Sequence, residues 1–116
     1  MKEIKAFVKP FKVNDILNKL LEAGYPNLTV SMAEGTGNFK GDESTISTHF
    51  SITDSKVAKI EIVCNKTEVD KIIAIISEYG RTGNPGDGII YVSGVEKAVR
   101  VKTGKEDDRN QFNHGF

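Results

Sequence analysis

The chain has 116 residues with 16 basic and 16 acidic side chains, so its formal net charge is zero. This length fits one domain, and the balanced charge argues against a protein that binds nucleic acid through phosphate electrostatics. The single cysteine, Cys64, excludes an internal disulfide. The chain opens with charged residues rather than a signal peptide, and no apolar run approaches the roughly 20 residues of a membrane span. We therefore expect a cytoplasmic protein without membrane insertion.

The first part of the chain predicts two strands with a helix between them. Residues 2–8 alternate as a half-buried strand does, and residues 28–34 repeat that pattern. Between them, Asn14 is the expected N-cap of an amphipathic helix, and Gly24 is its expected stop. The apolar positions of these three elements are Ile4, Ala6 and Val8, then Ile16, Leu17, Leu20 and Leu21, then Leu28, Val30 and Met32.

The second part predicts three strands and one helix. Residues 57–64 are dense in β-branched side chains, as strands are. Thr67-x-x-Asp70 is typical of a capping box that opens a helix, whose apolar positions are Val69, Ile72, Ile73 and Ile76. A fourth strand is expected at about 89–93 and a short fifth strand at 96–102. The resulting β-α-β-β-α-β order predicts an α+β, ferredoxin-like fold with two right-handed crossovers and an antiparallel sheet.

A long segment without sustained periodicity separates the second and third strands. Gly35 to Ser55 is rich in Gly, Ser, Thr and Asp and poor in large apolar residues. Loops of this length inside a compact domain are usually functional or disordered. Because the sequence on both sides belongs to one sheet, we expect a functional loop rather than a linker.

The run Arg81-Thr82-Gly83-Asn84-Pro85-Gly86-Asp87-Gly88 is the most informative in the chain. Glycine lets a backbone approach a ligand closely, and successive free N–H groups can then bind an anion. Arg100 and Lys102 are two residues apart, so both project from one face of an extended segment. Together these features indicate a phosphate-bearing ligand, with an ordinary surface loop followed by a charged strand as the alternative.

The run resembles the signature of the PII signal-transduction family, which reads T-G-x-x-G-D-G-K-I-F-V followed by R-I-R-T-G-E. Lys9-Pro10-Phe11-Lys12 and Lys59-Ile60-Glu61-Ile62-Val63 also resemble that family. The resemblance covers residues 1–104, a PII-like domain, and leaves 105–116 as a C-terminal tail. The signature positions that match are Thr82, Gly83, Gly86, Asp87, Gly88, Ile90, Val92, Arg100, Thr103 and Gly104.

The resemblance implies a regulatory protein rather than an enzyme. It implies a homotrimer that binds adenine nucleotides in clefts between subunits. Residues 36–55 take the place of the family's T-loop, which contacts a partner protein such as an enzyme or transporter. The partner here is unidentified.

The resemblance also implies a nucleotide site. We expect no catalytic or metal-binding residue in this chain. The adenine is read by backbone near Glu61 and Val63 with the hydroxyl of Thr29. Phosphates are held by the backbone of three consecutive loop residues, with two cations beside them and the base of the long loop closing over them. The full predicted set is Thr29, Gly35, Thr36, Gly37, Asn38, Glu61, Val63, Gly86, Asp87, Gly88, Arg100 and Lys102.

Three departures from the family pattern change the expected ligand. Phe39 stands where a Gln helps hold Mg²⁺ with 2-oxoglutarate, and a phenyl ring can supply no such contact. Asn38 and Ile89 stand where the family has an Arg and a Lys against the phosphates. We therefore expect ADP or AMP to bind at least as tightly as ATP, without Mg²⁺ in the usual arrangement. Some divergent members pair a nucleotide with bicarbonate, which makes bicarbonate a candidate second ligand.

Three other functions remain as alternatives. One is the conventional nitrogen-status sensor that responds to ATP and 2-oxoglutarate. Another is an enzyme that acts on a nucleotide, which is disfavoured because no general base is placed for catalysis. The third is a structural subunit of a shell or transporter assembly, which a thermal-shift panel of nucleotides would separate from a sensor.

Overall fold

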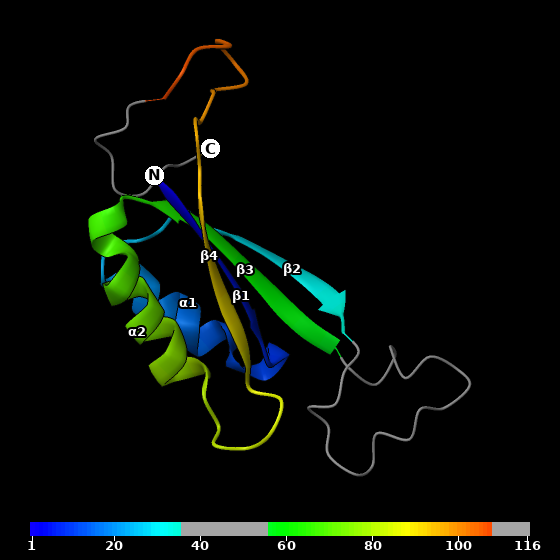
Figure 1. Ribbon diagram of the computed structural model, residues 1–116. Helices are drawn as coiled ribbons and strands as arrows, with labels where there is room; N and C mark the ends of the chain where they lie inside the picture. Colours follow the sequence, from blue (N-terminus) through cyan, green and yellow to red (C-terminus); the bar gives the residue numbers. More distant parts are fainter. Residues whose placement is uncertain (36–55, 108–116) are drawn as a thin grey trace.

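The computed structural model describes residues 1–35 and 56–107, which form one four-stranded sheet with helices on one face (Figure 1). The sheet order is β2-β3-β1-β4, and each neighbouring pair is antiparallel. This order confirms the predicted ferredoxin-like α+β fold. The elements are β1 (Lys2–Val8), η1 (Pro10–Lys12), α1 (Val13–Glu22), β2 (Thr29–Glu34), β3 (Lys56–Cys64), η4 (Lys66–Glu68), α2 (Val69–Gly80) and β4 (Gly88–Gly94).

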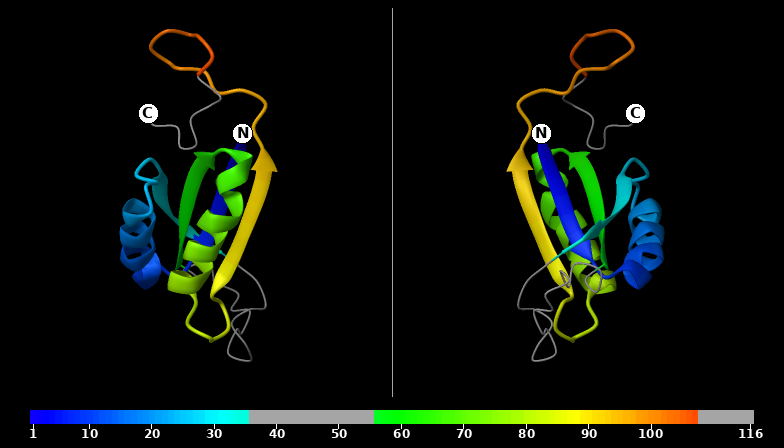
Figure 2. Two further views of the ribbon diagram at one scale, coloured as in Figure 1. Left: turned by 90° about the vertical axis from the view of Figure 1, so that its left-hand side faces the viewer. Right: turned by 90° about the vertical axis from the view of Figure 1, so that its right-hand side faces the viewer.

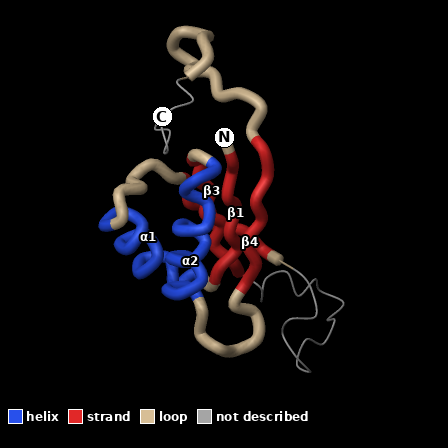
Figure 3. Tube along the Cα trace, turned by 60° about the vertical axis from the view of Figure 1, so that its left-hand side comes forward, coloured by secondary structure: helices blue, strands red, loops and turns tan. Residues whose placement is uncertain are grey.

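The core lies between the sheet and the two helices, α1 and α2. The helices lie side by side against one face of the sheet (Figures 2 and 3). The central strands β1 and β3 send alternate side chains into this layer, and in β1 these are the side chains that the alternation placed on one face. Each fully buried aliphatic side chain contributes roughly 1.5–3 kcal/mol of transfer free energy. Among residues 1–35 and 56–107, the buried hydrophobic residues are Ile4, Ala6, Val8, Ile16, Leu20, Tyr25, Ala58, Ile60, Ile62, Cys64, Ile72 and Ile76.

The outer strand β2 is less buried than its pattern predicted. Val30 and Met32 lie opposite Ile60 and Ala58 and so share the helix-covered face. They remain 37% and 60% exposed, because β2 is at the sheet edge. The alternation correctly predicted the face but not the degree of burial.

Both predicted N-caps are wrong, and for the same reason. A 3-10 turn precedes each helix and continues directly into it, so Lys12 and Glu68 occupy the N-cap positions without a side-chain hydrogen bond. Asn14 and Thr67 therefore lie inside helical turns. The stop at Gly24 is confirmed: its φ is 94°, and the flanking backbone bonds form the Schellman pattern that ends many helices.

The predicted fifth strand at 96–102 does not form. Beyond β4 the chain folds back on itself, and Val99 makes an isolated antiparallel bridge with Glu106. Gly104, with φ of 67°, provides the reversal. We call residues 98–107 the C-terminal hairpin; they project from the end of the sheet opposite the 81–88 loop (Figure 1).

The sheet face opposite the helices carries large side chains. Ile89 and Tyr91 are 52% and 54% exposed there, and the Tyr91 ring packs edge-on against Phe7, with ring centroids 6.3 Å apart.

Within residues 1–35 and 56–107, no helix is long and apolar enough to cross a bilayer.

Candidate functional site

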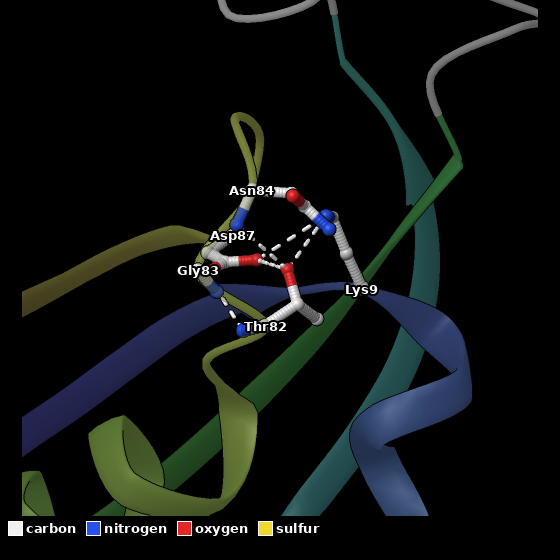
Figure 4. Close-up of polar contacts among 5 residues, drawn as sticks. All are labelled: Lys9, Thr82, Gly83, Asn84 and Asp87. Carbon is white, nitrogen blue, oxygen red and sulfur yellow. Dashed lines mark hydrogen bonds and ion pairs between the residues drawn. The ribbon is translucent and has the colours of Figure 1, made fainter.

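The loop that joins α2 to β4, taken together with the first residue of β4 as residues 81–88, is closed by the carboxylate of Asp87 (Figure 4). One carboxylate oxygen accepts the backbone N–H groups of Thr82, at 2.8 Å, and Gly83, at 2.9 Å. The other accepts the Thr82 hydroxyl, which in turn accepts the N–H of Asn84 at 3.1 Å. Asp87 therefore ties the end of the loop to its beginning. We call this segment the glycine loop.

Lys9 connects the glycine loop to the end of β1. Its ammonium lies 3.1 Å from the Thr82 hydroxyl and 3.2 Å from the Asp87 carboxylate (Figure 4). The hydrogen bond from the Thr82 hydroxyl, with those from the backbone and Lys9, holds the pKa of Asp87 far below its ordinary range. Asp87 is thus ionised at neutral pH, and its charge matches that of Lys9 within the cluster.

The glycines of this loop adopt backbone conformations that other residues avoid. Gly83, Gly86 and Gly88 have φ of 84°, 86° and 115°. At Gly88 a Cβ atom would lie 1.7 Å from the carbonyl oxygen of Phe7, so a larger residue there would displace β4 from β1. The loop therefore needs glycine both for conformation and for close packing.

A hollow of about 440 Å³ lies where the glycine loop meets the base of the long loop. It brings together four of the predicted site residues, Gly35, Gly86, Asp87 and Gly88, although Gly35 is far from the others in sequence. Its remaining walls are apolar and consist of Phe7, Val57 and Ile89. We call this hollow the loop pocket. A smaller hollow of about 320 Å³ lies on the helix side of β4, against Ser77 and Arg81.

Arg100 and Lys102 lie at the other end of the molecule. They follow the far end of β4, whereas the glycine loop precedes its near end (Figure 1). A seven-residue strand spans about 20 Å. Within one chain, these cations therefore do not reach the loop pocket, and the predicted phosphate site is divided into two parts.

The predicted adenine-reading residues lie between these two parts. Thr29 pairs with Glu61 across β2 and β3, level with Lys5 in the middle of β1. Val63 is two residues further along, toward the end that carries the C-terminal hairpin. The Glu61 carboxylate lies 3.4 Å from the ammonium of Lys59.

The C-terminal hairpin holds Arg100 firmly. Its guanidinium Nη2 lies 2.9 Å from a carboxylate oxygen of Asp107, and its backbone N–H donates to the carbonyl of Lys105 at 3.0 Å. Lys102 lies in the exposed turn at the hairpin tip. The two predicted cations thus differ in how well the fold fixes them.

Some predicted site residues lie outside the described part of the chain. In addition, two residues that contact Asp87 were not predicted to belong to the site. Thr36, Gly37 and Asn38, with Phe39, fall within 36–55, so their roles stay predictions. Sequence reasoning assigned no role in the site to Lys9 or to the side chain of Thr82. Their signals were a lysine directly after a strand and a hydroxyl five residues before an aspartate, neither of which is specific on its own.

Comparisons with known proteins agree with the signature. Residues 1–105 match the family model described as Nitrogen regulatory protein P-II. Proteins of that name from Pasteurella multocida and Klebsiella oxytoca are 37% and 38% identical over 109 residues, which cover 93% of this chain and 97% of each relative. One from Synechocystis is 35% identical over 108 residues, covering 92% of this chain and 96% of the relative. The chain therefore belongs to the P-II family of regulatory signal proteins.

Proposed function

We propose that this protein is a regulator that senses adenine nucleotides at a site assembled around the loop pocket. The observation that carries the proposal is the convergence of Gly35 and Gly86–Gly88 on one hollow. Backbone N–H groups in a glycine-rich turn are suited to phosphate, because no Cβ keeps the anion away. The Asp87 cluster supports this role by holding the loop in one shape before a ligand arrives.

The charge around the loop pocket favours ADP or AMP over ATP. None of the described residues that line this hollow carries a positive charge, and Ile89 presents an alkyl chain there. Lys9 is nearby, but its charge is already matched by Asp87. A third phosphate would add negative charge that these groups do not neutralise, and unmatched charge in a cleft is costly. We expect no requirement for Mg²⁺ in the usual arrangement.

The complete site needs a second copy of the chain. Arg100 and Lys102 lie about 20 Å or more along the sheet from the glycine loop, so the cations that reach one loop pocket must come from a neighbouring subunit. The exposed face with Phe7, Ile89 and Tyr91 supplies an apolar surface for such association. We propose a homotrimer with one nucleotide site at each of its equivalent interfaces.

Signalling would pass through residues 36–55. Gly35 precedes this segment and Val57 follows it closely, and both line the loop pocket. A ligand in the pocket would therefore contact residues on both sides of the segment and could favour one of its conformations over another. We propose that a cytoplasmic protein partner, such as an enzyme or transporter, reads this difference. Bicarbonate remains a candidate second ligand for the N–H groups at the loop base.

Competitive titration of AMP, ADP and ATP on the purified trimer tests the proposal. We expect ADP or AMP to bind at least as tightly as ATP, and 2-oxoglutarate to leave ATP binding unchanged. A tenfold or greater preference for ATP would instead support the conventional nitrogen sensor. Formation of product from ATP would support the enzyme alternative, and absence of binding by all three nucleotides would support a structural subunit.

A further inference from the structure

The C-terminal hairpin fixes the backbone of Arg100 on both sides. The Arg100 N–H donates to the carbonyl of Lys105 at 3.0 Å, and the Arg100 carbonyl accepts the N–H of Gly104 at 2.8 Å. A third bond, from the N–H of Asp107 to the carbonyl of Ala98 at 2.7 Å, closes the hairpin. Arg100 and Asp107 are thereby held on facing arms of one small, hydrogen-bonded unit.

The side chains of these two residues meet. Arg100 Nη2 lies 2.9 Å from Asp107 Oδ2, a distance typical of a charge-assisted hydrogen bond. The Asp107 side chain is only 11% exposed, whereas the Arg100 side chain is 33% exposed. The acid is therefore embedded in the hairpin, and the arginine side chain is only partly covered.

We propose that Asp107 is a positioning residue that orients Arg100 to bind a phosphate of a nucleoside diphosphate. This inference rests on the proposed nucleotide-sensing function. A guanidinium is a rigid fork with five donors, so it can hold a carboxylate on one edge and a phosphate on another. Because Asp107 orders the arginine before the ligand arrives, binding loses less side-chain entropy.

An effect of Asp107 in the opposite direction, weaker phosphate binding, also has a clear physical basis. Asp107 is an anion, and it would weaken phosphate binding if it competed with phosphate for Arg100. Its low exposure favours positioning, because an embedded carboxylate stays in place when a ligand takes the solvent-facing edge of Arg100. Asp107→Asn separates the two effects, since asparagine keeps an oxygen acceptor of the same reach but carries no charge.

Calorimetric titration of ADP into the proposed trimer of the 116-residue chain tests the inference. We expect Asp107→Ala to weaken ADP binding by about three- to tenfold, the effect of ordering one long side chain on binding. Asp107→Asn should stay within about twofold of the parent, because its amide oxygen still orients Arg100. Tighter binding by both variants would mean that Asp107 competes with phosphate and would overturn the proposal.

Two comparisons keep the test specific. Glu106→Ala is the matched control and should leave ADP affinity unchanged. Glu106 is a neighbouring acid of the same hairpin, and its carboxylate Oε1 lies 3.9 Å from the ammonium of Lys97. In an Arg100→Ala background, Asp107→Ala should have no further effect. A loss of affinity that persists without Arg100 would overturn the proposal, since Asp107 would then act by another route.

A nucleotide-free measurement separates this inference from the proposed function. Nitrogen-15 relaxation of the arginine side chains should show the Arg100 guanidinium ordered in the parent and mobile in Asp107→Ala. Equal mobility in both proteins would overturn the positioning role whatever the nucleotide result.

If the parent binds no ADP, the proposed function fails. If the parent binds ADP and Arg100→Ala weakens it while Asp107→Ala does not, the positioning inference alone fails.

Discussion

The glycine loop and the C-terminal hairpin each contain an aspartate that holds a cation, but the two pairs are used differently. Asp87 accepts two backbone N–H groups and a hydroxyl as well as Lys9, so its main effect is to shape the loop. Asp107 pairs with the Arg100 guanidinium, and the Arg100 side chain remains one-third exposed. In the proposed site, the first pair would shape a surface for the ligand and the second would present a charge to it.

The difference shows why a lysine suits one place and an arginine the other. Lys9 has a compact ammonium that can lie between Thr82 and Asp87, where its charge is matched locally. Arg100 has a planar fork that can bind its supporting acid and a second anion together. The same combination of opposite charges therefore neutralises a cation in one region and orients it in the other.

The largest effect is expected from breaking the glycine loop. Gly86→Val should abolish ADP binding while the trimer stays intact, because a β-branched residue cannot adopt the observed φ of 86°. Calorimetry and light scattering measure the two properties. Gly24→Ala is the matched control: its φ is 94° with nothing within 4 Å, so it should cost about 1 kcal/mol of stability and leave binding unchanged. ADP binding by Gly86→Val at parental affinity would place the site elsewhere.

Removing the cations of the C-terminal hairpin should have the next largest effect on ADP binding. We expect Arg100→Ala to cost roughly 1.5–3 kcal/mol of ADP binding free energy, the range for hydrogen bonds to charged groups. Lys102→Ala should cost less, because an exposed ammonium at the hairpin tip has no rigid fork. Titration calorimetry at one salt concentration compares the three proteins. Equal affinities would remove both cations from the phosphate site.

A pH series tests how the charge of Asp87 contributes to stability, and the expected effect is smaller. The pKa of Asp87 is lowered in the folded state, so the stability that its ionised form contributes is present above the ordinary aspartate pKa and is lost as pH falls below it. Asp87→Asn should therefore be less stable than the parent at pH 7, and the difference should disappear in acid. Denaturant unfolding at several pH values measures it.

The control for this series is Glu22→Gln, which removes an exposed acid that pairs with Lys19 at 3.3 Å. Exposed pairs of this kind contribute little, so this variant should follow the parent at every pH. A stability difference between parent and Asp87→Asn that stayed constant down to pH 2 would show that the charge of Asp87 does not hold the glycine loop together.

The smallest effect is expected from a ligand that the protein should ignore. Adding 2-oxoglutarate to an ATP titration should leave the ATP affinity unchanged, since Phe39 replaces the side chain that would share Mg²⁺ with it. A clear enhancement at millimolar 2-oxoglutarate would contradict the role that we assign to Phe39.

The sequence predicted the types and order of the elements from β1 to β4, but it also predicted a fifth strand that does not form. The alternation in β1 correctly predicted which side chains face the helices, because the period of a strand leaves only two faces to choose from. The helix starts were predicted wrongly, because a 3-10 turn moved each start ahead of Asn14 and Thr67. Those turns leave no strong pattern in the hydrophobic residues.

The sequence indicated candidate residues for the site but not their arrangement in space. The glycine motif indicated which backbone is suited to phosphate, and its residues do meet Gly35 in one pocket. The separation of Arg100 from that pocket depends on the full length of β4 and on the fold-back at Gly104. The closure of the loop by Asp87 depends on a three-dimensional approach to Thr82 that spacing alone does not specify.

The most direct test of a site divided between subunits is ADP binding by mixed trimers. Gly86→Val subunits keep Arg100, and Arg100→Ala subunits keep the glycine loop, so neither forms an intact site as a pure trimer. In the proposed trimer the interfaces run in one direction around the ring, so each mixed trimer should regain one intact site. Mixed trimers, purified with two different affinity tags and titrated with ADP, should bind at parental affinity with that reduced stoichiometry. Binding no stronger than in the two pure variants would contradict a site shared between neighbouring chains.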